Sequence, residues 1–137
     1  MPGTKMMKIG RGIEALDLYT WLPGQGENAV TIRTEGVDLI VTVAYDGDAG
    51  PCERALRFAS VCSFYSQAFP GPSMLGLDGD EARLLLKGVL VEYPDSEAAI
   101  AWSQHFRDSR RVRHYSVVFL AENRLLVVLA NRVSLNG

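Results

Sequence analysis

The residues that could do chemistry are concentrated between His105 and His114. This segment, HFRDSRRVRH, holds both histidines of the chain and four arginines beside one aspartate. Arginine can hold a carboxylate or a phosphate through two parallel hydrogen bonds, and histidine can transfer protons near neutral pH. The pattern therefore predicts a binding site for a small anion. The candidate residues are Arg110, Arg111, Arg113 and His114, with Arg132 farther along the chain.

A structural interpretation of the same residues carries more weight. Basic side chains complement the helix dipole where a helix ends, and the chain uses 11 arginines against three lysines throughout. His114 falls on a predicted strand beside Ser116 and near Asn131, and buried polar groups need hydrogen-bond partners. We therefore interpret His114 as part of a satisfied polar cluster, and we assign no catalytic residue.

No motif in the chain predicts a metal or a cofactor. The acidic loops at 46–48 and 78–81 lack the twelve-residue spacing of a calcium loop. The two histidines lie nine positions apart without a nearby cysteine, which is not the spacing of a zinc site. The glycines near residues 10–12 and 24–26 match neither GxGxxG nor GxxxxGK[ST]. We expect no cofactor.

Length and composition narrow the class of protein further. A chain of 137 residues with 47% hydrophobic residues can bury a core without disulfides, and we treat residues 1–137 as a single domain. A formal net charge of −2 disfavours nucleic-acid binding. No apolar run approaches the roughly 20 residues that cross a bilayer, so we expect no membrane insertion. Cys52 and Cys62 form no redox or metal motif, which favours a reducing cytoplasm.

The elements that would position these residues begin with a β-hairpin. Residues 5–22 fit either a strand or a short helix, with a slight preference for the strand. Residues 29–34 and 37–45 are rich in β-branched residues and predict a hairpin in which Thr34 pairs with Val37.

Two segments predict amphipathic helices. Residues 52–69 repeat apolar side chains with a helical period, although Phe64 falls on the polar side. The second helix begins with Asp95 or Ser96 as its N-cap, and Ile100 falls on its polar side. The apolar stripe of the first helix would consist of Ala55, Phe58, Ala59, Cys62, Tyr65 and Phe69. That of the second would consist of Ala99, Trp102, Ser103 and Phe106.

The remaining segments predict strands, and together the elements define a fold class. Residues 82–93 read as a strand, and residues 112–121 and 124–135 as a hairpin in which Ala121 pairs with Arg124. The order β-β-α-β-α-β-β, with a possible extra N-terminal strand, predicts an α+β fold. Two helices would pack on one antiparallel-rich sheet, and the strand-helix-strand unit could supply a single parallel crossover.

The predicted C-terminal hairpin is apolar on both faces, which leads to the functional hypotheses. Two helices cover only one side of a sheet, so the N-terminal hairpin or a second subunit must cover the other. We therefore favour a non-catalytic binding or interaction module that acts as a homodimer or binds another protein. The alternative is a small enzyme or ligand-binding protein with an Arg/His site for an anionic small molecule. The enzyme would require His114 and at least two arginines to converge in one pocket.

Overall fold

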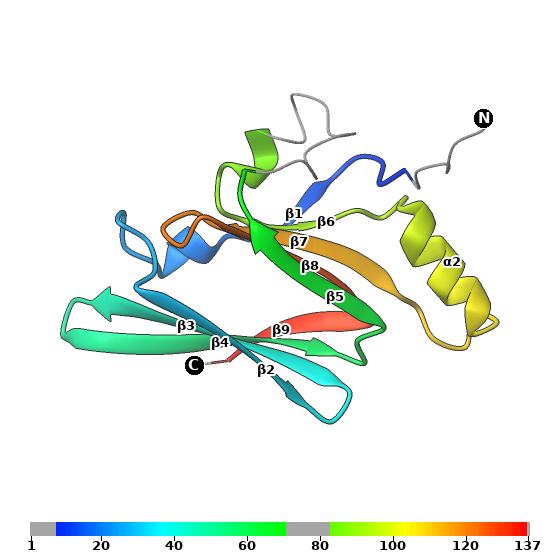
Figure 1. Ribbon diagram of the computed structural model, residues 1–137, viewed down its shortest axis with the longest axis horizontal. Coiled ribbons are helices and arrows are strands. Elements are labelled where there is room, and N and C mark those ends of the chain that lie inside the picture. The colour runs from blue at the N-terminus through cyan, green and yellow to red at the C-terminus, as the bar shows by residue number, and fades with distance from the viewer. Residues whose placement is uncertain (1–7, 71–82, 137) are drawn as a thin grey trace.

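The computed structural model describes residues 8–70 and 83–136, in which two antiparallel sheets pack face to face as a β-sandwich (Figure 1). The five-stranded sheet has the order β1 (Ile13–Leu16), β6 (Leu90–Glu92), β7 (Arg113–Phe119), β8 (Arg124–Ala130), β5 (Ser63–Ala68). The four-stranded sheet has the order β2 (Ala29–Glu35), β3 (Asp38–Gly47), β4 (Gly50–Ala59), β9 (Arg132–Asn136).

This architecture shows that the predicted fold class is wrong. Of the described residues, 50% lie in strands and 13% in helices, which is a sheet-dominated fold and not two helices packed on one sheet. The strands on either side of α2 (Glu97–His105), β6 and β7, pair antiparallel, so they form no parallel crossover. Among the described residues, α2 is too short to span a bilayer, and no other helix combines the length and apolar character that spanning needs.

The largest correction concerns residues 52–69, which form no helix. They belong to β4 and β5, which are connected through a turn where Ser60 has a φ of 52°. Leu56 and Phe58 are both fully buried, so the side chains of β4 alternate with the period of a strand. Strand β4 is hydrogen-bonded to β3 on one side and to β9 on the other. This pairing with two neighbours overrides the local helical pattern.

Both predicted hairpins form, each with its register shifted by two residues. In the first, Glu35 pairs with Asp38, where the sequence predicts Thr34 with Val37. In the second, Phe119 pairs with Arg124. Because side chains alternate along a strand, a shift of two leaves every residue on its predicted face.

Two predicted strands are shorter than expected. Residues 83–85 form a helical turn, and of the described residues 83–93 only Leu90–Glu92 pair as a strand. Gly88 separates the two with a φ of 71°, and a Cβ atom there would lie 2.7 Å from the Tyr19 ring. The segment 124–135 is divided at Asn131 into β8 and β9, which belong to different sheets.

The N-terminal segment and the second helix agree better with the sequence. Residues 13–16 form a strand, as slightly preferred, and a 3-10 turn (η1, Leu18–Thr20) follows. The helix α2 has Ser96 as its N-cap, whose hydroxyl accepts a hydrogen bond from the Ala99 amide at 3.2 Å. Figure 1 shows α2 at one end of the five-stranded sheet.

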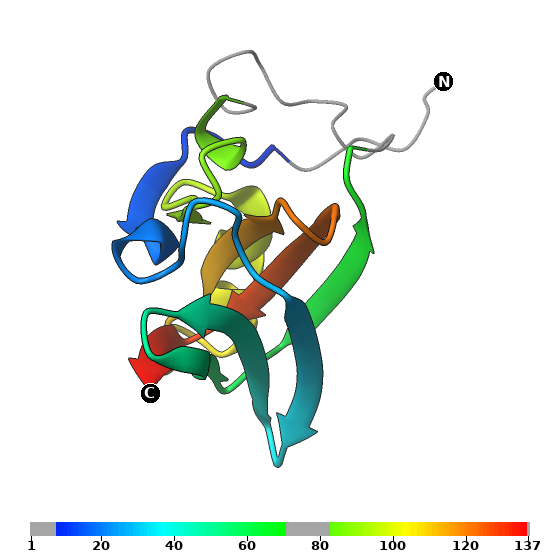
Figure 2. The same cartoon turned by 90° about the vertical axis from the view of Figure 1, so that its left-hand side faces the viewer.

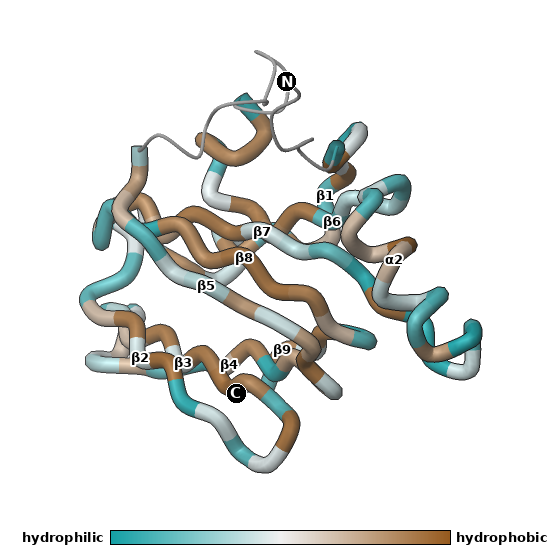
Figure 3. Tube along the Cα trace, turned by 45° about the vertical axis from the view of Figure 1, so that its right-hand side comes forward, coloured by the Kyte–Doolittle hydropathy of each residue, from teal (hydrophilic) through white to brown (hydrophobic). Residues whose placement is uncertain are grey.

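The apolar residues of the hairpin β7–β8 are buried on both faces within one chain. The inner face packs against the four-stranded sheet, and Figure 3 shows hydrophobic stretches in the strands of both sheets. The outer face forms a second core with residues from the segment that leads into β6. The hairpin β2–β3 therefore covers the inner face, and this face no longer argues for a dimer. The second core consists of Phe69, Leu85, Val89, Val91, Tyr93, Val118, Leu125 and Val127.

A buried carboxylate lies beside the turn that joins β7 to β8. One oxygen of Glu27, Oε1, accepts a hydrogen bond from the Ala121 amide at 3.2 Å. The other, Oε2, is buried without a partner among the described residues. Burial raises the pKa of Glu27 above its ordinary value. The folded protein therefore holds a carboxylate at neutral pH that burial disfavours in its charged form.

We expect Glu27→Gln to raise the free energy of unfolding at pH 7 by about 1 kcal/mol. The amide removes the buried charge and keeps an oxygen that can accept from Ala121. Because the native pKa of Glu27 is raised, the carboxyl is protonated in both folded and unfolded chains in acid, and the gain should disappear near pH 4. Urea denaturation at the two pH values measures the difference. A variant that is less stable at pH 7 would contradict the assignment of a strained charge.

Candidate functional site

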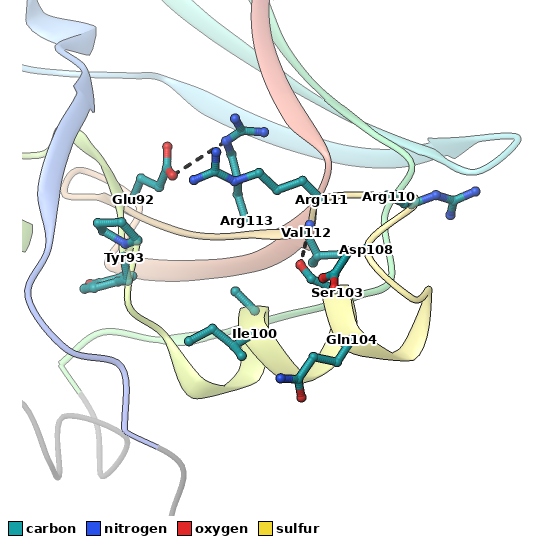
Figure 4. A pocket seen from close by; sticks show the side chains of 12 residues that line it. Glu92, Tyr93, Ile100, Ser103, Gln104, Asp108, Arg110, Arg111, Val112 and Arg113 are labelled. Atoms are coloured by element: carbon teal, nitrogen blue, oxygen red, sulfur yellow. Dashed lines mark hydrogen bonds and ion pairs between the residues drawn. The ribbon is translucent and has the colours of Figure 1, made fainter.

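A pocket of about 450 Å³ lies between α2 and the start of β7 (Figure 4). This volume falls within the range of small-molecule sites. Its apolar lining comes from Tyr93, Pro94, Ala99, Ile100 and Val112. Its polar lining comes from Glu92, Ser103, Gln104, Asp108, Arg110, Arg111 and Arg113. The pocket thus combines a hydrophobic wall with several charged groups.

The position of α2 is fixed by a buried hydrogen-bond chain behind the pocket. The hydroxyl of Ser96 accepts a hydrogen bond from the Ala99 amide, and it also forms a hydrogen bond of 2.7 Å with Nδ1 of His114. The His114 ring also lies edge-on to Tyr93, with centroids 5.0 Å apart. Burial lowers the pKa of His114 to about 4. His114 is therefore neutral at pH 7 and supports the N-terminus of α2.

Arg113 is held in place by two partners. Its Nη1 donates to the Asn131 carbonyl at 2.7 Å, and its Nε lies 3.6 Å from the Glu92 carboxylate. Burial, and then the charge of Glu92, raise the pKa of Tyr115 to about 12 against the opposing charges of Arg113 and Arg111. The charges of both guanidinium groups therefore act on the same buried phenol.

Arg111 is the free cation of this group. Its side chain extends towards Glu92 and Arg113 in Figure 4. Its guanidinium makes no hydrogen bond or ion pair with any residue that the structure describes, although its backbone carbonyl accepts from Asn131 at 2.8 Å. Arg110 extends the opposite way, and its guanidinium stacks over the Phe106 ring at 4.6 Å. Arg111 is thus the arginine available to a ligand.

The structure brings together some of the predicted site residues and separates the others. Arg110, Arg111 and Arg113 all line the pocket. His114 does not line it, because its side chain is buried against Ser96 and Tyr93. Arg132 lies on β9 and acts electrostatically on Asp38, at the four-stranded sheet. The condition set for an enzyme, His114 and two arginines in one pocket, is not met.

Sequence reasoning missed the residues that shape the rest of the pocket. Ser103 accepts a hydrogen bond from the Val112 amide at 2.9 Å and joins α2 to the strand. A serine in the apolar stripe of a predicted helix was a signal for such a contact. Glu92 was hidden because its place beside Arg113 depends on the antiparallel pairing of β6 with β7.

The pocket has the chemistry of an anion-binding site. Two carboxylates, Glu92 and Asp108, stand against three arginines, which leaves one formal positive charge. Glu92 is paired with Arg113, so Arg110 and Arg111 remain against Asp108. In the described part of the chain no three metal-ligating side chains gather at one place.

Comparison with known proteins adds no family to these observations. No family model, no curated protein and no solved structure matches this chain.

Proposed function

We propose that this domain is a non-catalytic binding module whose pocket takes a small organic anion. The observation that carries the proposal is the unpaired guanidinium of Arg111 at a 450 Å³ pocket with one excess positive charge. A planar guanidinium binds a carboxylate through two parallel hydrogen bonds. Arg111 therefore binds the anion, and the ion pair of Arg113 and Glu92 forms the wall of the pocket beside it.

The other walls of the pocket favour an anion with an apolar body. Ile100 is half exposed on α2 and, with Pro94 and Val112, offers a hydrophobic surface to the ligand. Ser103 uses its oxygen to accept from Val112, which leaves its hydroxyl hydrogen available for a ligand. A compact carboxylate with one ring or a short aliphatic chain suits both surfaces. We therefore choose benzoate as a probe, with benzyl alcohol as its uncharged counterpart.

Arg111→Ala is expected to weaken benzoate binding by tenfold or more, because a hydrogen-bonded charge pair contributes about 1.5–3 kcal/mol. Chemical-shift titration of the Ser103 and Val112 amides measures the affinity. Arg111→Lys should lose part of the affinity, because lysine keeps the charge and loses the planar fork. Arg132→Ala is the control, because Arg132 lies on β9 and outside the pocket.

Two results would contradict this function. Benzyl alcohol that shifts the same amides as strongly as benzoate would show that charge does not select the ligand. Equal losses in the Arg111→Ala and Arg132→Ala variants would show that benzoate responds to the overall charge of the protein and not to the pocket.

Self-association is a second proposal, and one observation favours it. Although β2–β3 covers the inner face of β7–β8, the edge strand β5 exposes Phe64 and Tyr65. Neither ring belongs to the two cores of the sandwich. We propose that the module acts as a homodimer.

We also propose that the module works in the cytoplasm. Cys52 and Cys62 are free, half-buried thiols. Burial raises the pKa of Cys62, which keeps its thiol protonated and less reactive. Two unpaired cysteines suit a reducing compartment.

A further inference from the structure

The edge strand β5 differs from the other three edges of the two sheets. It pairs with β8 on one side, and Figure 2 shows it, in green, at the outer margin of the molecule. Its sequence, SFYSQA, contains no charged residue. The other edges carry Glu14 in β1, Arg33 and Glu35 in β2, and Arg132 in β9. Charges on an edge oppose pairing with another chain, and β5 lacks this protection.

Two aromatic rings extend from this edge on opposite faces. Phe64 lies opposite Val128, a residue of the core between the sheets, and is 41% exposed. Tyr65 lies opposite Val127, a residue of the outer core, and is 49% exposed. Each ring therefore stands next to a buried apolar row that ends at β5, and a further strand would continue both rows.

The backbone of β5 is also ready for another strand. The amide of Phe69 donates to the Asn123 carbonyl at 2.8 Å, in line with the register that pairs Ala68 with Arg124. In an antiparallel pair, alternate residues direct both backbone groups to the same neighbour. Counting back from Phe69, the odd-numbered residues of β5 bond to β8. The amides and carbonyls of Phe64, Ser66 and Ala68 therefore point outward.

We propose that two copies of this chain associate through β5, strand against strand and antiparallel, so that their five-stranded sheets become continuous. This inference rests on the self-association proposed above and names its surface. The two-fold axis passes between the two Tyr65 residues, which face each other on the outer side. Phe64 and Ser66 then exchange backbone hydrogen bonds with Ser66 and Phe64 of the second copy.

A second copy suits this edge for reasons visible in the side chains. An uncharged strand that pairs with itself places no like charges opposite each other. The two Tyr65 rings form a cross-strand aromatic pair. On the inner side, Ser66 accepts a hydrogen bond from Arg124 Nη1 at 3.1 Å. The Phe64 ring of the second copy would therefore lie beside a guanidinium, an arrangement that cation–π attraction favours.

The oligomeric state of the full chain tests this proposal. Sedimentation equilibrium should show a dimer, and Tyr65→Lys should weaken it by tenfold or more because two lysines would face each other. Ile13→Lys is a matched control, since Ile13 is also 49% exposed and lies on β1, the opposite edge of the same sheet. This control should remain a dimer, and circular dichroism should show that both variants fold.

The alternatives are separable by the same measurement. A monomeric wild-type protein would overturn both the β5 interface and the self-association proposed above. A dimer that persists in Tyr65→Lys, or that Ile13→Lys weakens equally, would overturn the β5 interface and leave self-association standing through another surface.

Disulfide trapping tests the register without relying on a destabilising charge. In a Cys62→Ser background, Tyr65→Cys should form a covalent dimer under mild oxidation, because directly opposite residues of this kind have Cα atoms within disulfide range. Ser63→Cys lies on the same side of the strand and is the control. It should not crosslink, because its two copies would be four residues out of register. Faster trapping of the Ser63→Cys variant would overturn the proposed register.

Discussion

Lowering the pH from 7 to 4 should reduce the free energy of unfolding by about 3 kcal/mol through His114 alone. The native ring is buried behind α2, and its pKa is lowered from 6.5 to about 4. In the unfolded chain the ring is solvated and takes up a proton near pH 6.5. The stability associated with the neutral ring is therefore complete above pH 6.5 and is lost as the pH falls towards 4.

Other groups titrate in the same experiment, and their signs differ. Burial raises the pKa of Glu27, so its protonation favours the folded state as the pH falls. The pKa of Asp38 is lowered by its hydrogen bond from the Ser60 amide, and that of Glu35 by its hydrogen bond from Arg33. Both carboxylates begin to lose their stabilising contribution as the pH falls through their ordinary pKa values, near the acid end of this range. The contribution of His114 is therefore best isolated as a difference between variants.

Urea denaturation of the wild type and of His114→Gln at pH 7, 5.5 and 4 gives that difference. Glutamine can still accept from the Ser96 hydroxyl and does not titrate, so the pH dependence of the variant should be shallower by about 3 kcal/mol. Parallel curves for the two proteins would contradict the assignment. Nuclear magnetic resonance titration of the His114 ring in the folded wild type provides a check that needs no variant.

Leu56→Ala should lower the free energy of unfolding by about 2–5 kcal/mol. Leu56 is 0% exposed in β4, and it packs in the core between the two sheets. It lies opposite Val41 of β3 on one side and Leu135 of β9 on the other. Truncation would leave a cavity that three paired strands cannot easily close. Chemical denaturation at pH 7 measures the loss.

Ala55→Thr provides the matched control for this substitution. Ala55 is the next residue of β4 and belongs to the opposite, outer side of the four-stranded sheet. Ala55 is partly exposed and threonine suits such a strand position, so we expect a change within about 0.5 kcal/mol. A helix over 52–69 would place Ala55 in its apolar stripe, where threonine would be costly. A large loss for Ala55→Thr with a small loss for Leu56→Ala would therefore contradict the sandwich.

The elements that the sequence predicts well are those whose signals are local. The hairpins form because their β-branched residues alternate, and α2 begins at Ser96 because its hydroxyl caps the first turn. The segment 52–69 is mispredicted because its apolar spacing fits a helix and two strands alike. The segment forms strands because it pairs with β3, β8 and β9, and these partners cannot be read from the segment itself.

The candidate site shows the same division. The run from Arg110 to Arg113 is contiguous, so the sequence could identify a basic cluster that lines the pocket. Whether each arginine is paired depends on residues brought from elsewhere. Arg113 forms an ion pair with Glu92 and donates a hydrogen bond to the Asn131 carbonyl. Arg110 stacks over the Phe106 ring, so Arg111 remains available to a ligand. No spacing rule distinguishes three neighbouring arginines in this way.

Asn131 does more than divide β8 from β9. Its amide donates to the Ala59 carbonyl in β4, its side chain donates to the Arg111 carbonyl, and its own carbonyl accepts from Arg113. The joint between the two sheets and the two pocket arginines thus share one residue. A shift of the backbone at Asn131 would therefore disturb the contact between the two sheets and the positions of both arginines together.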